Sequence, residues 1–187
     1  DISAARVAWE LEGPMGADHI ITIDLHNTAI QGFFRISWVD NLKGSQVLLP
    51  YIKRLIKNPE NTTILPTDLG GAKRANYYST YLNTDVAFAY KVRNYKMKNT
   101  VSDLKIMGNV KNRTVYIVDD MIDTGGTFCK TVEIAKSNGA KEIIGVTTFG
   151  LLNGNAIETL NTLYNDGKFS KLICTDATYI PKDVLQQ

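Results

Sequence analysis

TVYIVDDMIDTGGT, residues 114–127, is the stretch that decides the predicted fold of this chain. Its first half, Thr114 to Val118, has the β-branched and aromatic composition of a buried strand. Two adjacent carboxylates close the strand, and the small residues DTGGT then form a tight loop that opens directly into a helical pattern. A strand, an acidic pair and a glycine turn at a helix start together indicate a site for a phosphorylated sugar.

The physical reasons lie in the loop itself. Unpaired N–H groups and the positive end of the helix attract a phosphate, and the glycines allow close backbone approach and positive φ. The hydroxyls of Thr124 and Thr127 add donors, whereas the carboxylates of Asp119 and Asp120 can accept hydrogen bonds from a ribose diol. For DTGGT taken alone, a solvated strand end followed by an ordinary turn is an equal alternative.

The composition is that of a globular protein. The chain has 187 residues, of which 44% are hydrophobic and 21% charged, and a net charge of +2. This length suits one domain, or one domain with part of another. The cysteines, Cys129 and Cys174, match no metal or redox spacing and are expected to be packed thiols, as in a reducing, cytoplasmic setting. No signal peptide or membrane-spanning apolar run is found in the sequence.

The N-terminal part predicts a helix over residues 3–11 and a short buried strand from Ile20 to Ile23. Helical spacing returns over residues 46–57, and the breaker sequence NPEN at 58–61 marks the candidate domain boundary, which gives domains 1–57 and 58–187. The chain begins with Asp inside a helical pattern, so we interpret it as a fragment or a processed form.

Strands and helices alternate after this boundary. The predicted strands are 62–66, 86–90, 114–118, 143–147 and 172–174, and the predicted helices are 72–82, 127–138 and 156–163. This alternation with apolar strands predicts an α/β fold in which helices cover both faces of a parallel sheet. His26, Asp68, Lys91 and Asp119 all fall at predicted strand ends. Because ligands bind beyond the carboxyl ends of such strands, this coincidence predicts an active site.

Two of these residues are candidate metal ligands. His26 follows Asp24 at a strand end, and a neutral imidazole can ligate a divalent cation directly or through water. Together with Asp68 it could hold Mg²⁺ that bridges nucleotide phosphates, because Mg²⁺ favours few protein ligands plus phosphate oxygens. A lone histidine is more often structural or solvated, and that alternative stays open.

A second turn and a pair of cations complete the candidate residues. The segment DLGGAKR, with Gly70 and Gly71, could cradle a diphosphate on its amides, although a plain helix start would look similar. Lys91 and Arg93 are spaced to lie on one side of an extended backbone, where they could stabilise charge on a transferring phosphoryl group. The interval from Lys91 to Arg113 holds seven basic residues and one acid. Such a run is usually a solvated loop face, but its position just before the glycine loop also favours an anionic ligand.

These segments resemble one family in order. ADHIITIDLH, IQGFF, DLGGAKR, the Lys91-Val92-Arg93 site, GNVKNR and VDDMIDTGGT are similar to those of ribose-phosphate pyrophosphokinases, which have a type I phosphoribosyltransferase-like fold. The resemblance runs from about Ile2 to Pro181. It implies transfer of the diphosphoryl group of ATP to ribose 5-phosphate, which gives phosphoribosyl pyrophosphate (PRPP) and AMP. It also implies Mg²⁺ as the cofactor and a homo-oligomer. Because the sequence has no recognised nucleic-acid-binding motif and no membrane-spanning run, we expect no nucleic-acid or membrane partner.

The resemblance also implies roles for individual residues. His26, Gly70 and Gly71 look like ATP-binding residues, with His26 and Asp68 as the ligands of Mg²⁺. Lys91 and Arg93 look like the catalytic residues. The ribose 5-phosphate site would be formed by Asp119, Asp120, Asp123, Thr124, Gly125, Gly126 and Thr127.

The sequence departs from the family pattern in several places. Most of the first of two related halves is absent, and we place the start of this chain near the end of that half. Thr148-Phe149 stands where the family usually has Thr-His, and insertions fall near Gly13 and Trp38. Two alternatives remain: a noncatalytic regulatory subunit of the same fold, and a phosphoribosyltransferase that uses PRPP.

Overall fold

A computed structural model of the protein describes residues 3–92 and 103–185. The chain forms two compact units, Asp1–Gln46 and Val47–Gln187. This division falls at the beginning of a helix, earlier than the boundary expected at 57 and 58. The helix belongs to the second unit by its packing, because its residues Leu48, Leu49 and Ile52 lie in a core cluster of that unit.

The first unit contains helix α1 (Ser3–Glu12), strand β1 (His19–Ile23), the 3₁₀ turn η1 (Thr28–Phe33) and strand β2 (Trp38–Leu42). The two strands pair in parallel. The expected helix and strand are present, but the expected burial of the strand is wrong, because Ile21 is 64% exposed. Side chains alternate between the two faces of a strand, and β1 is exposed at every second residue.

A single carboxylate organises the end of α1. Glu12 accepts hydrogen bonds from the backbone N–H groups of Arg35, Ile36 and Ser37, at 2.7–3.1 Å. These bonds, the largest contribution coming from Ser37, lower the pKa of Glu12 to about 2. The charged carboxylate therefore fixes the segment that leads into β2 against α1.

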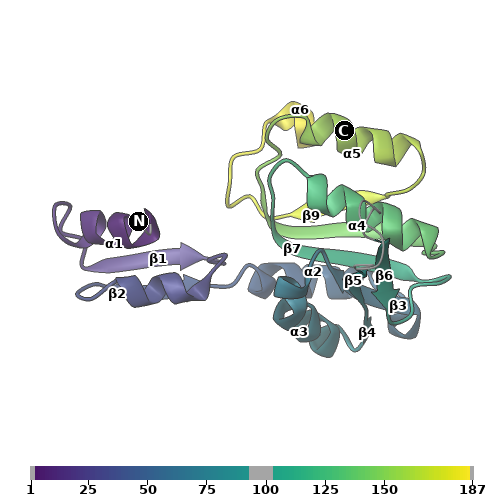
Figure 1. Ribbon diagram of the computed structural model, residues 1–187, viewed down its shortest axis with the longest axis horizontal. Coiled ribbons are helices and arrows are strands. Elements are labelled where there is room, and N and C mark those ends of the chain that lie inside the picture. Colours follow the sequence, from purple (N-terminus) through teal and green to yellow (C-terminus); the bar gives the residue numbers. More distant parts are fainter. Residues whose placement is uncertain (1–2, 93–102, 186–187) are drawn as a thin grey trace. The chain divides into compact units, whose positions relative to one another are not determined.

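The second unit is built on a five-stranded sheet in which every neighbouring pair is parallel (Figure 1). The strand order is β4-β3-β7-β8-β9. The bounds are β3 Thr62–Pro66, β4 Asp85–Val86, β7 Thr114–Ile122, β8 Glu142–Gly150 and β9 Lys171–Cys174. Strand β7 lies at the centre, so the stretch that decided the predicted fold is the middle of the sheet.

Helices cover both faces of this sheet, as the alternating pattern predicted. Helices α4 (Gly126–Ser137) and α5 (Ala156–Asn165) lie on one face, and α2 (Ser45–Leu55) and α3 (Ala72–Leu82) on the other (Figure 1). Successive residues of β7 divide between the two layers: Val115 and Ile117 pack in the α4 and α5 cluster, and Tyr116 and Val118 in the α2 and α3 cluster. The remaining short elements are η2 (Pro59–Asn61), η3 (Leu69–Gly71) and α6 (Lys182–Leu185).

The predicted strand 86–90 is wrong in its extent. Asp85 and Val86 form β4 of the main sheet, and the chain then continues as β5 (Phe88–Val92), which pairs antiparallel with β6 (Asp103–Met107). These two strands form a sheet of their own. A strand therefore lies within the interval expected to be a basic loop. The sequence predicted Lys91 at an end of the parallel sheet. This prediction is wrong, because Lys91 lies in β5, outside that sheet.

Candidate functional site

The acidic pair lies inside β7 rather than after it, because this strand continues to Ile122. Asp119 stands opposite Thr147 of β8, near the carboxyl end of the parallel sheet. Asp68 follows the neighbouring strand β3 and lies at the same edge. Of the four residues expected to share an active-site edge, the structure thus brings these two together.

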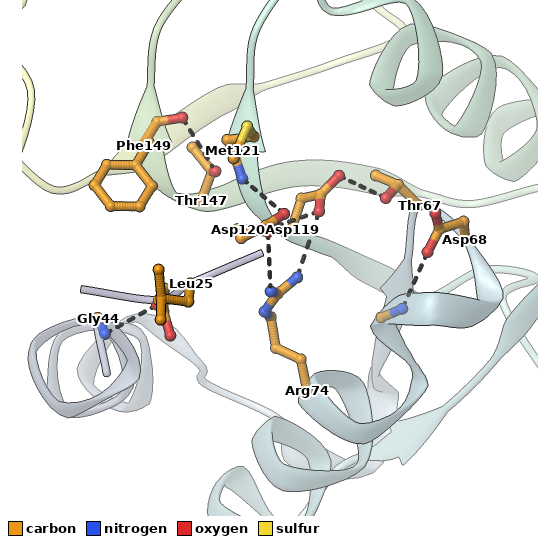
Figure 2. A network of polar contacts seen from close by, with 12 residues as sticks. Leu25, Gly44, Thr67, Asp68, Arg74, Asp119, Asp120, Met121, Thr147 and Phe149 are labelled. Atoms are coloured by element: carbon orange, nitrogen blue, oxygen red, sulfur yellow. Dashed lines mark hydrogen bonds and ion pairs between the residues drawn. The ribbon is translucent and has the colours of Figure 1, made fainter. Parts of the chain in front are cut away.

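Asp119 is held on two sides. Its Oδ2 accepts a 2.6 Å hydrogen bond from the Thr67 hydroxyl, and its Oδ1 accepts one from the backbone N–H of Asp120 at 2.8 Å. The Arg74 guanidinium approaches Oδ1 to 3.4 Å. Figure 2 shows these contacts converging on Asp119 from Thr67, which follows strand β3, and from Arg74 of helix α3.

Arg74 joins the two carboxylates. Its Nη2 lies 3.7 Å from Oδ2 of Asp120, while its Nη1 faces Asp119 (Figure 2). The side chain of Asp120 is only 4% exposed, whereas that of Asp119 is 22% exposed. Asp119 is therefore the carboxylate that faces solvent at this edge, and Asp120 supports it from within. Asp120 also accepts the backbone N–H of Met121 at 3.1 Å.

The surroundings of Asp119 raise the pKa of its carboxyl group. Burial and, after it, the neighbouring Asp120 carboxyl raise the pKa of Asp119 to about 6, against the Thr67 hydrogen bond, which lowers it. A carboxyl group whose pKa lies near 6 can bind a ligand hydroxyl as an acceptor or hold a proton close to neutral pH.

The DTGGT loop has the geometry of a phosphate turn. Gly125 adopts a left-handed conformation with φ +77° and caps helix α4, and no side chain caps the helix there. The first N–H groups of a helix have no partner within it, and they lie at its positive end. The side chains of Thr124 and Thr127 are exposed, and a Cβ at Gly126 would meet nothing within 4 Å. The loop is therefore open to an anion.

Asp123 fixes the far side of the loop. Its Oδ1 accepts a 2.7 Å hydrogen bond from Nδ2 of Asn153, and its carbonyl accepts the backbone N–H of Asn153 at 3.0 Å. The segment after β8 is thus joined to the phosphate turn. The seven residues expected to form a sugar-phosphate site all lie within residues 119–127, at the end of β7, in the loop that follows and at the beginning of α4.

The second glycine turn forms the predicted strand-to-helix connection. Asp68 caps η3, because its Oδ1 accepts the Gly71 N–H at 3.0 Å. A Cβ on Gly71 would lie 3.0 Å from the Cβ of Pro66, and one on Gly70 would lie 3.1 Å from Oδ1 of Asp68. A side chain at either position would therefore be in tight contact with the turn itself.

The remaining candidates lie elsewhere or outside the described residues. His26 is exposed and belongs to the first compact unit, whereas Asp68 belongs to the second. Lys91 lies in β5, with its backbone opposite Leu104. Arg93 lies outside the described residues. Within the described part of the chain, no group of three or more His, Cys, Asp or Glu side chains is arranged to hold a metal ion.

Three residues of this site were not among the sequence candidates. Thr67 and Arg74 contact Asp119, and Asn153 contacts Asp123. Arg74 ends the DLGGAKR segment, so a basic residue in the first turn of a helix was a usable signal. Thr67 directly precedes that segment. Nothing in the local sequence marks Asn153, because its contact joins residues 30 positions apart.

A parallel sheet with a glycine turn at a helix start on its carboxyl edge is typical of α/β proteins that bind phosphorylated ligands. A family model described as a phosphoribosyl transferase domain matches residues 40–178. The chain belongs to this family.

Within this family, the chain is similar to proteins named ribose-phosphate pyrophosphokinase. Ribose-phosphate pyrophosphokinase 3 of Saccharomyces cerevisiae is 40% identical over 180 residues, which are 94% of this chain and 54% of that protein. Ribose-phosphate pyrophosphokinase 1 of Candida albicans has the same identity and coverage. The crystal structure of phosphoribosylpyrophosphate synthetase from Mycobacterium smegmatis superposes with a TM-score of 0.76 at 32% identity, over 94% of this chain and 59% of that chain.

The chain thus spans about half the length of the curated relatives it matches. The expected fold and the expected resemblance to ribose-phosphate pyrophosphokinases are both confirmed. Among the described residues, no helix is both long and apolar enough to cross a membrane.

Proposed function

We propose that this protein is a ribose-phosphate diphosphokinase, which transfers the diphosphoryl group of ATP to the 1-hydroxyl of ribose 5-phosphate and releases AMP. The observation that carries the proposal is the position of Asp119, a partly exposed carboxylate beside the open N-terminus of α4. In this proposal the sugar phosphate lies on the DTGGT turn and Asp119 accepts hydrogen bonds from the ribose diol. The relatives named ribose-phosphate pyrophosphokinase support it.

The protein would act mainly by positioning and charge neutralisation. The 1-hydroxyl attacks the β-phosphorus of ATP in line, and AMP departs with the electrons of the broken P–O bond. Arg74 keeps Asp119 and Asp120 in place while the sugar binds. Lys91 and Arg93 are proposed to stabilise the charge that develops on the transferring group.

Mg²⁺ belongs to this proposal as the cation bound to ATP. It is usually held by one or two carboxylates together with substrate phosphates. Asp68 fits this requirement, because it is exposed and its Oδ1 alone is used to cap η3. His26 would be the second ligand, and Gly70 and Gly71 would contact the ATP phosphates. A homo-oligomer and a cytoplasmic location also remain proposals.

Calorimetric titration with ribose 5-phosphate tests the sugar site directly. We expect Asp119→Ala to weaken binding at least tenfold while the protein stays folded, because a carboxylate that accepts hydrogen bonds from the diol is lost. Asp166→Ala, at the exposed end of α5, is the matched control and should bind normally. Unchanged affinity of Asp119→Ala would remove the sugar-site assignment.

An AMP-release assay with Mg²⁺–ATP and ribose 5-phosphate then separates the remaining alternatives. Turnover supports the diphosphokinase, and Lys91→Ala should lower it by orders of magnitude. Lys105→Ala is the control, because Lys105 stands opposite Tyr90, next to Lys91 in the β5–β6 pairing. Binding of both ligands without AMP release would favour a noncatalytic subunit. Release of diphosphate from PRPP on addition of a base would favour a phosphoribosyltransferase.

A further inference from the structure

A cavity lies at the amino-terminal edge of the parallel sheet, whereas the candidate site lies at the carboxyl edge. Its volume is about 540 Å³. The first residues of four strands line it, namely Thr62, Thr114, Glu142 and Lys171. Small-molecule sites commonly have volumes of several hundred Å³, so the cavity is large enough for more than a single inorganic ion.

Tyr116 is an unpaired polar group in the wall of this cavity. Its residue is only 2% exposed, yet its hydroxyl has no hydrogen-bond partner among the described residues. The hydroxyl is not among the fully buried polar atoms that lack a partner, which in the described part of the chain are those of Thr84 and Thr178, so water or a ligand in the cavity can reach it. Burial, with Glu142 as a second cause, raises the pKa of Tyr116 to about 12. At neutral pH the hydroxyl is therefore protonated and can donate.

The charge around the cavity is positive. Lys57, Lys141 and Lys171 line it, against the single acid Glu142. None of the three lysines has an ion-pair partner among the described residues. Glu142 is partly engaged, because its Oε2 accepts the Thr114 hydroxyl at 3.3 Å. Ammonium groups without an ion-pair partner beside a hydroxyl donor form an arrangement that favours a phosphate group.

We propose that this cavity is a second anion-binding site, which takes a small phosphorylated molecule through the Tyr116 hydroxyl and the surrounding lysines. The site is separate from the DTGGT turn. Tyr116 and Asp119 are three residues apart on β7, which corresponds to about 10 Å along a strand, and they lie toward opposite edges of the sheet. Both sites therefore share the central strand without sharing a side chain.

Residue-resolved NMR titration with inorganic diphosphate tests the proposal. We expect saturable shifts of the backbone amides of Thr62, Asn112 and Lys141. Shifts at Gly125 and Gly126 report the DTGGT turn separately in the same spectra, so failure at one site is distinguishable from failure at the other. Absence of saturable shifts at the amino-terminal edge at millimolar diphosphate would overturn the proposal.

One single and one double substitution test whether the Tyr116 hydroxyl and the lysines bind the diphosphate. Tyr116→Phe removes only the hydroxyl and should weaken binding at this edge about tenfold, with the control Tyr164→Phe unchanged. Lys141→Gln combined with Lys171→Gln should weaken binding further, whereas Lys136→Gln combined with Lys182→Gln should not. The lysines lie at the surface, so this pair tests the site even if Tyr116→Phe fails to fold. Equal losses in the test and control pairs would show non-specific attraction and contradict the proposal.

The stability of Tyr116→Phe without ligand gives an independent test. Because the wild-type hydroxyl has no partner in the fold, its removal should leave the denaturation midpoint unchanged or higher. A clearly lower midpoint would mean that the hydroxyl is satisfied within the fold, and the site would lose its central donor.

Discussion

The hydroxyl of Thr67 donates a 2.6 Å hydrogen bond to the carboxylate of Asp119, between the ends of two neighbouring parallel strands. Thr67 is 8% exposed, so this bond is largely shielded from water. It fixes one oxygen of Asp119 and leaves the other toward Arg74 and the edge of the sheet. The position of the candidate site therefore depends on β3 as much as on β7.

Replacement of Thr67 by Val should destabilise the protein. The isosteric change leaves one oxygen of a mostly buried carboxyl without its donor, which we expect to cost about 1–2 kcal/mol of unfolding free energy at pH 7. It should also raise the pKa of Asp119, because the Thr67 bond lowers it. Urea denaturation and carboxyl ¹³C NMR measure the two effects. Thr80→Val, on the exposed side of α3, is the control, and an equal loss there would contradict this role.

Asp119 should make stability depend on pH. Its pKa in the folded protein is about 6, against 3.8 for an ordinary aspartate, so the folded state holds the proton more tightly than the unfolded state. Stability due to this group is therefore greatest below pH 3.8 and falls as the pH rises through 6. Asp119→Asn should match the wild type near pH 4 and exceed it at pH 7 in thermal denaturation. A difference that does not change with pH would show that Asp119 titrates normally.

The two glycines of the phosphate turn should respond differently to alanine. Gly125 has φ +77°, so Gly125→Ala forces a side chain into the left-handed region and should cost about 1–2 kcal/mol of stability. Space is not the limit, because the nearest atoms to a new Cβ lie 3.7 Å away. Gly126→Ala has open space at the first position of α4 and should be neutral or stabilising. Chemical denaturation of both variants checks the order, which an equal loss in both would contradict.

Glu12 should control the order of the segment before β2. Glu12→Gln removes the charge that accepts the N–H groups of Arg35, Ile36 and Ser37. These amides should exchange with solvent faster in the variant. In the wild type the lowered pKa means that the stabilisation is present above pH 4.5 and is lost as the pH falls through about 2. Hydrogen-exchange NMR at pH 5 measures the effect, with Glu10→Gln as the control, and unchanged protection in Glu12→Gln would refute it.

Much of the fold follows from local pattern. The strand and helix periodicity of the second unit, the glycine end of α4 and the two phosphate turns are each visible in a few adjacent residues. The full length of β7 is not visible in the local pattern, because a strand is normally predicted to end where polar residues begin. Asp119 and Asp120 continue the strand only since Arg74 and Thr67 satisfy them from other elements.

The sequence by itself determined the class of fold and the residues that form the phosphate turn, because hydrophobic periodicity and glycine conformations are local properties. Only the tertiary structure decided which elements meet at that turn. The antiparallel pairing that removes Lys91 from the main sheet, and the contacts of Arg74 and Asn153, join residues far apart in the chain. The amino-terminal cavity is likewise lined by the first residues of four strands that are separated in the sequence by helices and loops. Such contacts depend on how elements pack, and short-range sequence patterns do not specify that packing.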